Sequence, residues 1–210
     1  MVHIKKTDVP AVFSDNQKKY KTYDALNDSE IKSKLKEILI KEQGGICAYC
    51  MVGIDLEKST IEHYIPRNGI NGNQSLSLDY NNMLAVCSNS RGENKANQHC
   101  DVSKGDRLLN IDPRNEQHIA QIGYKSDGEI YSDVSEFDDD LNNVLHLNLP
   151  TLKNNRKSAL NAALGILAAK GNSKENLQWA IEYYSKNTVP FIGIIRWTLD
   201  NRQKKINKNT

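Results

Sequence analysis

The sequence contains no apolar run that approaches the roughly 20 residues a helix needs to cross a bilayer. Its opening residues, Met-Val-His-Ile-Lys-Lys-Thr-Asp, lack the apolar stretch of a signal peptide. Internal repeats are also absent, which excludes architectures that stack copies of one unit. We therefore expect a cytoplasmic protein that neither spans nor binds a membrane.

Net charge is small over the whole chain, but it is unevenly distributed. The 210 residues carry a net charge of +2, and a composition of 26% charged and 38% hydrophobic residues is typical of a soluble globular protein. The net charge is +1 for residues 1–110, −7 for residues 111–150 and +8 for residues 151–210. The two charged blocks either form solvated faces that partly neutralise each other, or one of them binds a partner or a nucleic-acid backbone.

Local patterns predict helices at both ends of the chain. Residues 1–26 are polar and interrupted by Pro10, which favours an extended segment or loop. A capping box of Asn27 and Glu30 and an apolar stripe at helical spacing predict a helix over residues 28–43. Three further helices are predicted in the basic block, the first over residues 152–170 with a cap at Thr151. The second begins with a capping box of Asn172 and Glu175, and the third opens at Pro190.

The middle of the chain favours short strands and loops. Short strands are predicted over residues 54–56 and 60–65, and residues 83–86 form a short apolar run that leads into Cys87. A short helix is predicted over residues 101–109 and a hairpin over residues 119–131. We divide the chain into an N-terminal extended segment and helix (1–43), a metal-binding module (44–110), an acidic hairpin and connector (111–150) and a basic helical region (151–210).

The four cysteines are Cys47, Cys50, Cys87 and Cys100. The Cys-x-x-Cys pair forms a knuckle that can direct two thiolates to one tetrahedral ion, and four sulfur ligands suit structural zinc. The second pair has 12 intervening residues, so Cys87 could instead be a buried apolar residue, or His99 could replace one cysteine. A redox role for the Cys-x-x-Cys pair is disfavoured, because no βαβ pattern surrounds it.

Three more motifs follow in order. Thr60 to Pro66 carries an acid–histidine pair, Glu62-His63; Asn82 lies five residues before Cys87; and Cys100 begins Cys-Asp-Val-Ser-Lys-Gly-Asp. Each has a plain structural interpretation. A lone histidine is usually structural, Asn82 could be a turn residue with Asn81 equally available, and Asp101 could be an acid that stabilises a helix N-terminus.

Taken together, these motifs resemble the HNH nuclease family, and most of all the PtuB-type HNH proteins of Septu anti-phage systems and some retrons. The HNH match covers roughly residues 44–109, with Asp101 in place of the family's usual Asn or His and a long loop after Cys87. The likeness to PtuB-type proteins also includes the segment from Leu145 to Lys157 and spans most of the chain. The resemblance implies an α+β fold: a zinc-stapled ββα-metal HNH core flanked by an N-terminal helix and a C-terminal helical region.

The resemblance also implies roles for individual residues. His63 would act as general base with its ring oriented by Asn82, while Glu62 and Asp101 would hold a catalytic Mg²⁺ or Mn²⁺ ion. Because neighbouring side chains of a strand point to opposite faces, a bend must bring Glu62 and His63 together. The structural Zn²⁺ ligands would be Cys47, Cys50, Cys87 and Cys100, and the expected phosphate contacts are Arg67, Lys104 and Arg107.

The function implied is a metal-dependent HNH endonuclease of an anti-phage defence complex. Its substrate would be DNA, or alternatively tRNA or another RNA. Its partner would be a PtuA-type ATPase, with a retron reverse transcriptase and noncoding RNA as a further context. The basic helices of residues 151–206 are expected to carry the partner surface. The competing hypothesis is a non-catalytic zinc-binding module that binds nucleic acid or protein.

Overall fold

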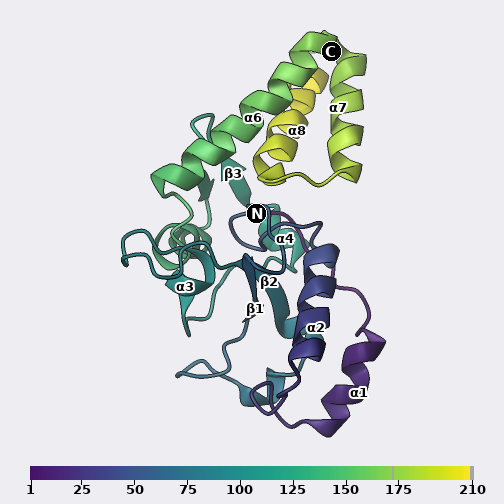
Figure 1. Cartoon of the computed structure of the whole chain (residues 1–210). Helices are drawn as coiled ribbons and strands as arrows, with labels where there is room; N and C mark the ends of the chain where they lie inside the picture. Colours follow the sequence, from purple (N-terminus) through teal and green to yellow (C-terminus); the bar gives the residue numbers. More distant parts are fainter. Residues whose placement is uncertain (172, 209–210) are drawn as a thin grey trace.

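The computed structural model describes residues 1–171 and 173–208, so the cap expected at Asn172 lies outside the described residues. It combines helices with two small antiparallel sheets, in agreement with the expected mixture of α and β structure. Figure 1 shows helices α6, α7 and α8 gathered at one end of the molecule and α1 toward the other, with β1 and β2 in the middle beside α2. Among the described residues, none of the helices is both long and apolar enough to cross a membrane.

The N-terminal region contains one more helix than the sequence predicts. Helix α1 (Ala11–Lys19) occupies part of the segment expected to be extended. Pro10 begins this helix rather than interrupting it, because its carbonyl accepts hydrogen bonds from the backbone N–H groups of Phe13 and Ser14. Proline is well tolerated at a helix start, where its missing N–H has no intrahelical role. Phe13 is buried and fixes the helix against the core.

Helix α2 (Ser29–Glu42) confirms the predicted helix and delivers the chain to the first cysteine pair. Its cap is Asp28 rather than Asn27, with the carboxylate accepting from the N–H groups of Glu30 and Ile31. Leu35 and Leu39 are buried on its inner face. Burying two such side chains stabilises the fold by roughly 3–6 kcal/mol.

A β-hairpin and a short helix form the centre of the molecule. Strand β1 (Ser59–His63) pairs antiparallel with β2 (Met83–Cys87), so that Ser59 lies opposite Cys87 and His63 opposite Met83. Between the strands lie the short 3₁₀ turns η1 (Gln74–Leu76) and η2 (Tyr80–Asn82). Helix α3 (Cys100–Lys104) follows and packs on β2. Residues 54–56 form no strand; the preceding Gly53 makes an isolated bridge with Ile46.

The acidic connector folds around a second hairpin. Strands β3 (Ile122–Tyr124) and β4 (Ile130–Ser132) confirm the predicted hairpin, with Gly128 in its turn at a φ of +93°. A Cβ atom at Gly128 would lie 2.1 Å from the Lys153 carbonyl oxygen, so both the backbone angle and the space require glycine. Short helical turns flank the hairpin: α4 (Glu116–Ile119), α5 (Ser135–Asp139) and the π-helical turn η3 (Asp140–Val144).

The three C-terminal helices are α6 (Pro150–Lys170), α7 (Lys174–Lys186) and α8 (Ile192–Lys208). Helix α6 begins at Pro150, with Leu149 rather than Thr151 in the cap position. The Ser173 side chain caps α7 by accepting from the N–H of Asn176. Within the described parts of the chain, buried apolar side chains from all four segments defined by the sequence join one cluster, and the segment boundaries remain predictions.

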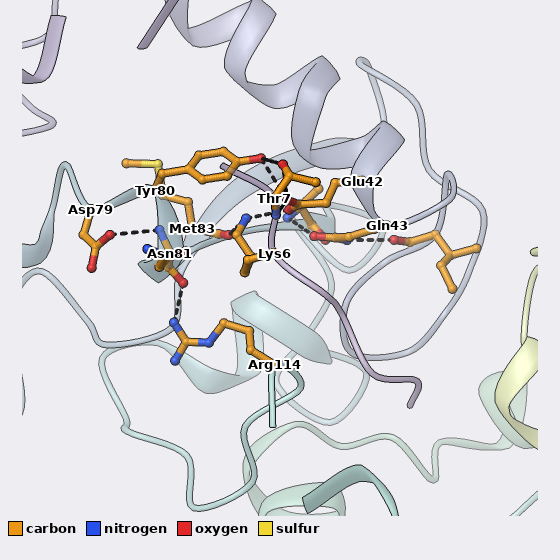
Figure 2. Close-up of polar contacts among 11 residues, drawn as sticks. Lys6, Thr7, Glu42, Gln43, Asp79, Tyr80, Asn81, Met83 and Arg114 are labelled. Atoms are coloured by element: carbon orange, nitrogen blue, oxygen red, sulfur yellow. Dashed lines mark hydrogen bonds and ion pairs between the residues drawn. The ribbon is translucent and has the colours of Figure 1, made fainter. Parts of the chain in front are cut away.

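A partly buried polar network ties the N-terminal segment to α2 and β2. Figure 2 shows Lys6, Thr7 and Tyr80 converging on the Glu42 carboxylate, with a Lys6 Nζ to Glu42 Oε2 distance of 2.6 Å. Lys6 also donates to the carbonyl oxygen of Met83, the residue paired with His63. This network fixes the strand edge beside the candidate site.

Gln43 completes the open edge of β2. Its side-chain amide donates to the Ala85 carbonyl oxygen and accepts from the Ala85 N–H, both at 2.8 Å, and it also donates to the carbonyl oxygen of Ile46. A single side chain therefore replaces a neighbouring strand at this position and links the end of α2 to the segment that leads into Cys47.

Candidate functional site

The four cysteines meet at one buried point. Cys47 and Cys50 come from the knuckle after α2, Cys87 ends β2, and Cys100 begins α3. Their Sγ atoms all lie within 4.8 Å of one another, with 3.8 Å between Cys47 and Cys100 and 3.6 Å between Cys50 and Cys87. A tetrahedral zinc site with Zn–S bonds of about 2.3 Å places its sulfurs about 3.8 Å apart. The four thiols therefore fit a metal such as zinc.

The long loop between Cys87 and Cys100 does not prevent this geometry. Ser90 and His99 close the loop, because the Ser90 hydroxyl accepts from the His99 N–H and donates to the His99 carbonyl. The His99 Nδ1 atom lies 3.2 Å from the Cys100 sulfur and 3.9 Å from the Cys87 sulfur. This arrangement favours four cysteine ligands, with His99 beside them as a hydrogen-bond partner of sulfur.

Glu62 lies in a buried polar cluster on one side of β1. Its carboxylate contacts the Lys104 ammonium at 2.7 Å and the Tyr49 hydroxyl at 3.3 Å. Burial raises the pKa of Glu62 to about 8, while the Lys104 charge opposes this rise and the nearby Asp101 charge adds to it. The two main effects have opposite signs, and burial is the larger.

Asp101 joins the same cluster from the first turn of α3. Its side chain lies close enough to Glu62 for its negative charge to raise the pKa of Glu62, so the two predicted magnesium ligands are neighbours. Asp101 also lies 3.6 Å from the guanidinium of Arg91, which reaches it from the long loop. Two neighbouring carboxyl groups provide the hard oxygen ligands that magnesium and manganese prefer.

His63 faces a different environment from Glu62. Its Nε2 atom lies 2.9 Å from the Ser77 carbonyl oxygen, and its ring meets the edge of the Tyr23 ring with centroids 4.9 Å apart. A carbonyl oxygen can only accept, so Nε2 carries the proton and the lone pair lies on Nδ1. Burial lowers the pKa of His63 to about 4, which keeps the ring neutral at pH 7. The bend expected to bring Glu62 and His63 to one side is not seen in these contacts.

Asn82 makes contacts other than the expected one with the His63 ring. Its amide donates to the carbonyl oxygens of Ile65 and Leu76 at 3.0 and 3.2 Å, and its oxygen accepts from the Ile65 N–H at 2.7 Å. Both amide hydrogens are thus donated to the backbone of the loop that follows β1. Asn82 positions this loop, and the Ser77 carbonyl of the same loop contacts the His63 ring.

The three residues expected to contact phosphate lie in different surroundings. Lys104 is only 1% exposed and contacts Glu62, so it does not face solvent in this structure, and its contact with phosphate stays a prediction. The exposed Arg107 donates to backbone carbonyls at the end of α3 and to the Val144 carbonyl at the end of η3. Arg67 is half-buried, forms an ion pair with Asp24 and lies over the Tyr23 ring.

The sequence analysis missed Tyr49 as a member of the site, and it assigned Lys104 to phosphate rather than to Glu62. Lys104 lies three residues after Asp101 on one helix, and this spacing places both side chains on one face. It was therefore a detectable neighbour of the carboxylates. Tyr49 lies between the first two cysteines and reaches Glu62 through tertiary packing, for which the sequence offers no signal.

No protein-family model matches the chain. It is 27% identical over 158 residues to a protein of Vibrio cholerae serotype O1 biovar El Tor named "Retron Vc95 putative HNH endonuclease", a match that covers 70% of this chain and 73% of the relative. This similarity supports the resemblance to HNH endonucleases and suggests a nuclease of a defence system.

Proposed function

We propose that this protein is a metal-dependent HNH endonuclease that hydrolyses phosphodiester bonds of nucleic acid. The observation that carries the proposal is that Glu62 and Asp101 are close enough for their charges to interact, while His63, the next residue of β1, is kept neutral by burial in a separate environment. The adjacent cluster of four buried cysteines supports a structural zinc ion in the same module. DNA is the favoured substrate and RNA, including tRNA, the alternative.

In the proposed reaction, His63 receives a proton from the attacking water at Nδ1, while its Nε2–H stays on the Ser77 carbonyl. Water oxygen bonds to phosphorus, the bond from phosphorus to the 3′ oxygen breaks, and the 3′ oxygen takes a proton from solvent. A magnesium or manganese ion held by Glu62 and Asp101 would supply charge neutralisation at the phosphate and the leaving oxygen. Lys104 must release the Glu62 carboxylate for that ligand to be available.

We further propose that the protein acts in anti-phage defence together with a PtuA-type ATPase. A retron reverse transcriptase and noncoding RNA are the associated context. This part rests on the resemblance and on the name of the Vibrio relative. The partner surface is placed on the C-terminal helices, where Tyr183 and Ile166 are exposed while Tyr184 and Phe191 are buried.

The competing function, a non-catalytic zinc-binding module, is favoured by one observation. Lys104 occupies the Glu62 carboxyl group at 2.7 Å, and Tyr23 and Ser77 contact the His63 ring, so among the described residues the carboxyl groups and the histidine do not share one open cleft. A module that only binds nucleic acid or protein needs no such cleft.

The substitution His63→Gln distinguishes the two functions. A glutamine amide can still donate to the Ser77 carbonyl but cannot act as a base, so the fold and the zinc content should be retained. We expect cleavage of plasmid DNA or tRNA by the complex purified with its ATPase to fall by a factor of about 10² or more. His3→Gln, at an exposed histidine, is the control. Cleavage by His63→Gln at the unaltered rate would favour the non-catalytic module.

A further inference from the structure

A basic segment that the proposed reaction does not use lies beside His63. Residues 17–23, which we call the basic strap, read Gln-Lys-Lys-Tyr-Lys-Thr-Tyr and contain no acid. Lys18, Lys19 and Lys21 are exposed, and among the described residues none of the three forms an ion pair. Three positive charges within four residues create a local field that attracts an anionic polymer.

The basic strap is held in place by the loop that follows β1. The Gln17 side chain donates to the Leu78 carbonyl, and the Tyr23 N–H donates to the Ser77 hydroxyl at 3.1 Å. The carbonyl of the same Ser77 accepts from the His63 ring. The strap and the candidate base are therefore anchored to one short stretch of chain.

Tyr23 joins the strap directly to the candidate base. Its ring contacts His63, and two cations lie over it: Lys32 at 4.7 Å and Arg67 at 5.3 Å from the ring centroid. A partly buried aromatic ring surrounded by cations keeps positive charge close to His63. Arg67 also forms an ion pair with the Asp24 carboxylate.

We propose that the basic strap binds the phosphate backbone of nucleic acid and guides the strand toward His63. The guiding of the strand toward His63 rests on the proposed nuclease function, whereas the binding of nucleic acid by the basic strap does not. The contacts would be to phosphates, so the strap contributes affinity and little sequence preference. Each phosphate that the protein neutralises releases a counterion, so binding weakens as the salt concentration rises. Each such contact steepens the slope of the logarithm of the binding constant against the logarithm of the salt concentration by about 0.9 for duplex DNA, or about 0.7 for a single strand.

The chain offers a control of equal charge on α8. Lys204, Lys205 and Lys208 are also exposed, and α8 ends far from α1 (Figure 1). A triple alanine substitution there removes the same three charges as Lys18→Ala, Lys19→Ala and Lys21→Ala in the strap. Any general effect of net charge should therefore be equal in the two triple variants.

The test is equilibrium binding of a labelled 30-base-pair DNA duplex and of tRNA to the full-length protein in magnesium-free buffer, over 50–300 mM salt. For the duplex we expect the strap triple variant to lower the slope by about 2–3 and the affinity at 100 mM salt at least tenfold. The α8 variant should change the slope by less than about 0.5. An unchanged slope in the strap variant, or an equal loss in both variants, would overturn the proposal.

These experiments distinguish an error in the strap assignment from an error in the nuclease mechanism. If the strap variant loses salt-dependent binding while His63→Gln still cuts, the strap is retained and the nuclease mechanism is lost. If His63→Gln abolishes cleavage while the strap variant binds normally, the nuclease stands and the strap assignment is wrong. Melting temperatures of both triple variants should equal that of the unaltered protein, because all six lysines are exposed.

Discussion

Replacing Glu62 by glutamine should change how the stability of the protein depends on pH. Burial raises the pKa of this carboxyl from 4.5 to about 8, against the attraction of Lys104. A carboxyl with a higher pKa in the folded state binds more protons when folded, so the free energy of unfolding falls as the pH rises between the two values. Glutamine at this position does not titrate and removes the effect.

The magnitude follows from these two pKa values. With 4.5 for the unfolded and about 8 for the folded chain, Glu62 alone accounts for a loss of roughly 2 kcal/mol between pH 6 and pH 8. The free energy of unfolding of the unaltered protein, minus that of Glu62→Gln, should therefore fall by this amount over that range. Titrating groups that do not interact with Glu62 are common to both proteins and cancel in the difference, whereas Lys104 and Asp101 interact with it and are part of the effect.

The assay is urea unfolding of the zinc-loaded proteins at pH 6, 7 and 8, without magnesium, followed by tryptophan fluorescence. Glu37→Gln, at an exposed residue of α2, controls for the loss of one negative charge. Parallel pH profiles for the unaltered protein and Glu62→Gln would refute the reasoning, because burial would then not govern the protonation of Glu62. Magnesium added at pH 8 should stabilise the unaltered protein and not the variant, since a cation bound to the folded state stabilises it by mass action.

Two further substitutions test the scaffold. Cys47→Ser should lower the zinc content below one ion per chain and abolish cooperative unfolding, because the four sulfurs form one closed site. Metal analysis and thermal unfolding test this prediction. A variant that keeps full stability without zinc would contradict it. Asn82→Ala should cost about 2–4 kcal/mol, because it leaves the Ile65 N–H and the carbonyls of Ile65 and Leu76 without their partner. Hydrogen exchange should then accelerate in residues 65–78 while α7 stays protected, and uniform acceleration would argue against a local role.

Elements with a clear period could be predicted from the sequence. Helix α2 and the C-terminal helices have apolar residues at helical spacing, and the Asp127-Gly128 turn indicates the second hairpin. Helix α1 was missed because Pro10 was interpreted as a break, although a proline at a helix start gives the same local sequence. The strand expected over residues 54–56 did not form, because a short apolar run does not specify its pairing partner.

The candidate site was predictable to the extent that its residues are close in sequence to a metal ligand. The spacing of the cysteine motifs predicted that the four cysteines come together, and Asp101 follows Cys100 directly in the sequence. The contact between Lys104 and Glu62, the cover of Tyr23 over His63 and the backbone role of Asn82 all depend on which distant segments pack together. Side-chain alternation predicts that Glu62 and His63 diverge, and the structure retains that divergence.

The cysteine cluster and the carboxylate cluster share the elements that position them. Cys100 and Asp101 are consecutive residues at the start of α3, and Tyr49, which donates to Glu62, lies inside the Cys47–Cys50 knuckle. A zinc ion would therefore act on the chemistry only through position, by holding Asp101 and Tyr49 against Glu62. Loss of a cysteine should disturb the fold and the carboxylates together. Asp101 is half-exposed at a helix start, so its loss should disturb metal-dependent activity and leave the zinc site intact. The carboxylate cluster can therefore be disrupted without the cysteine cluster, whereas the cysteine cluster cannot be disrupted without the carboxylates.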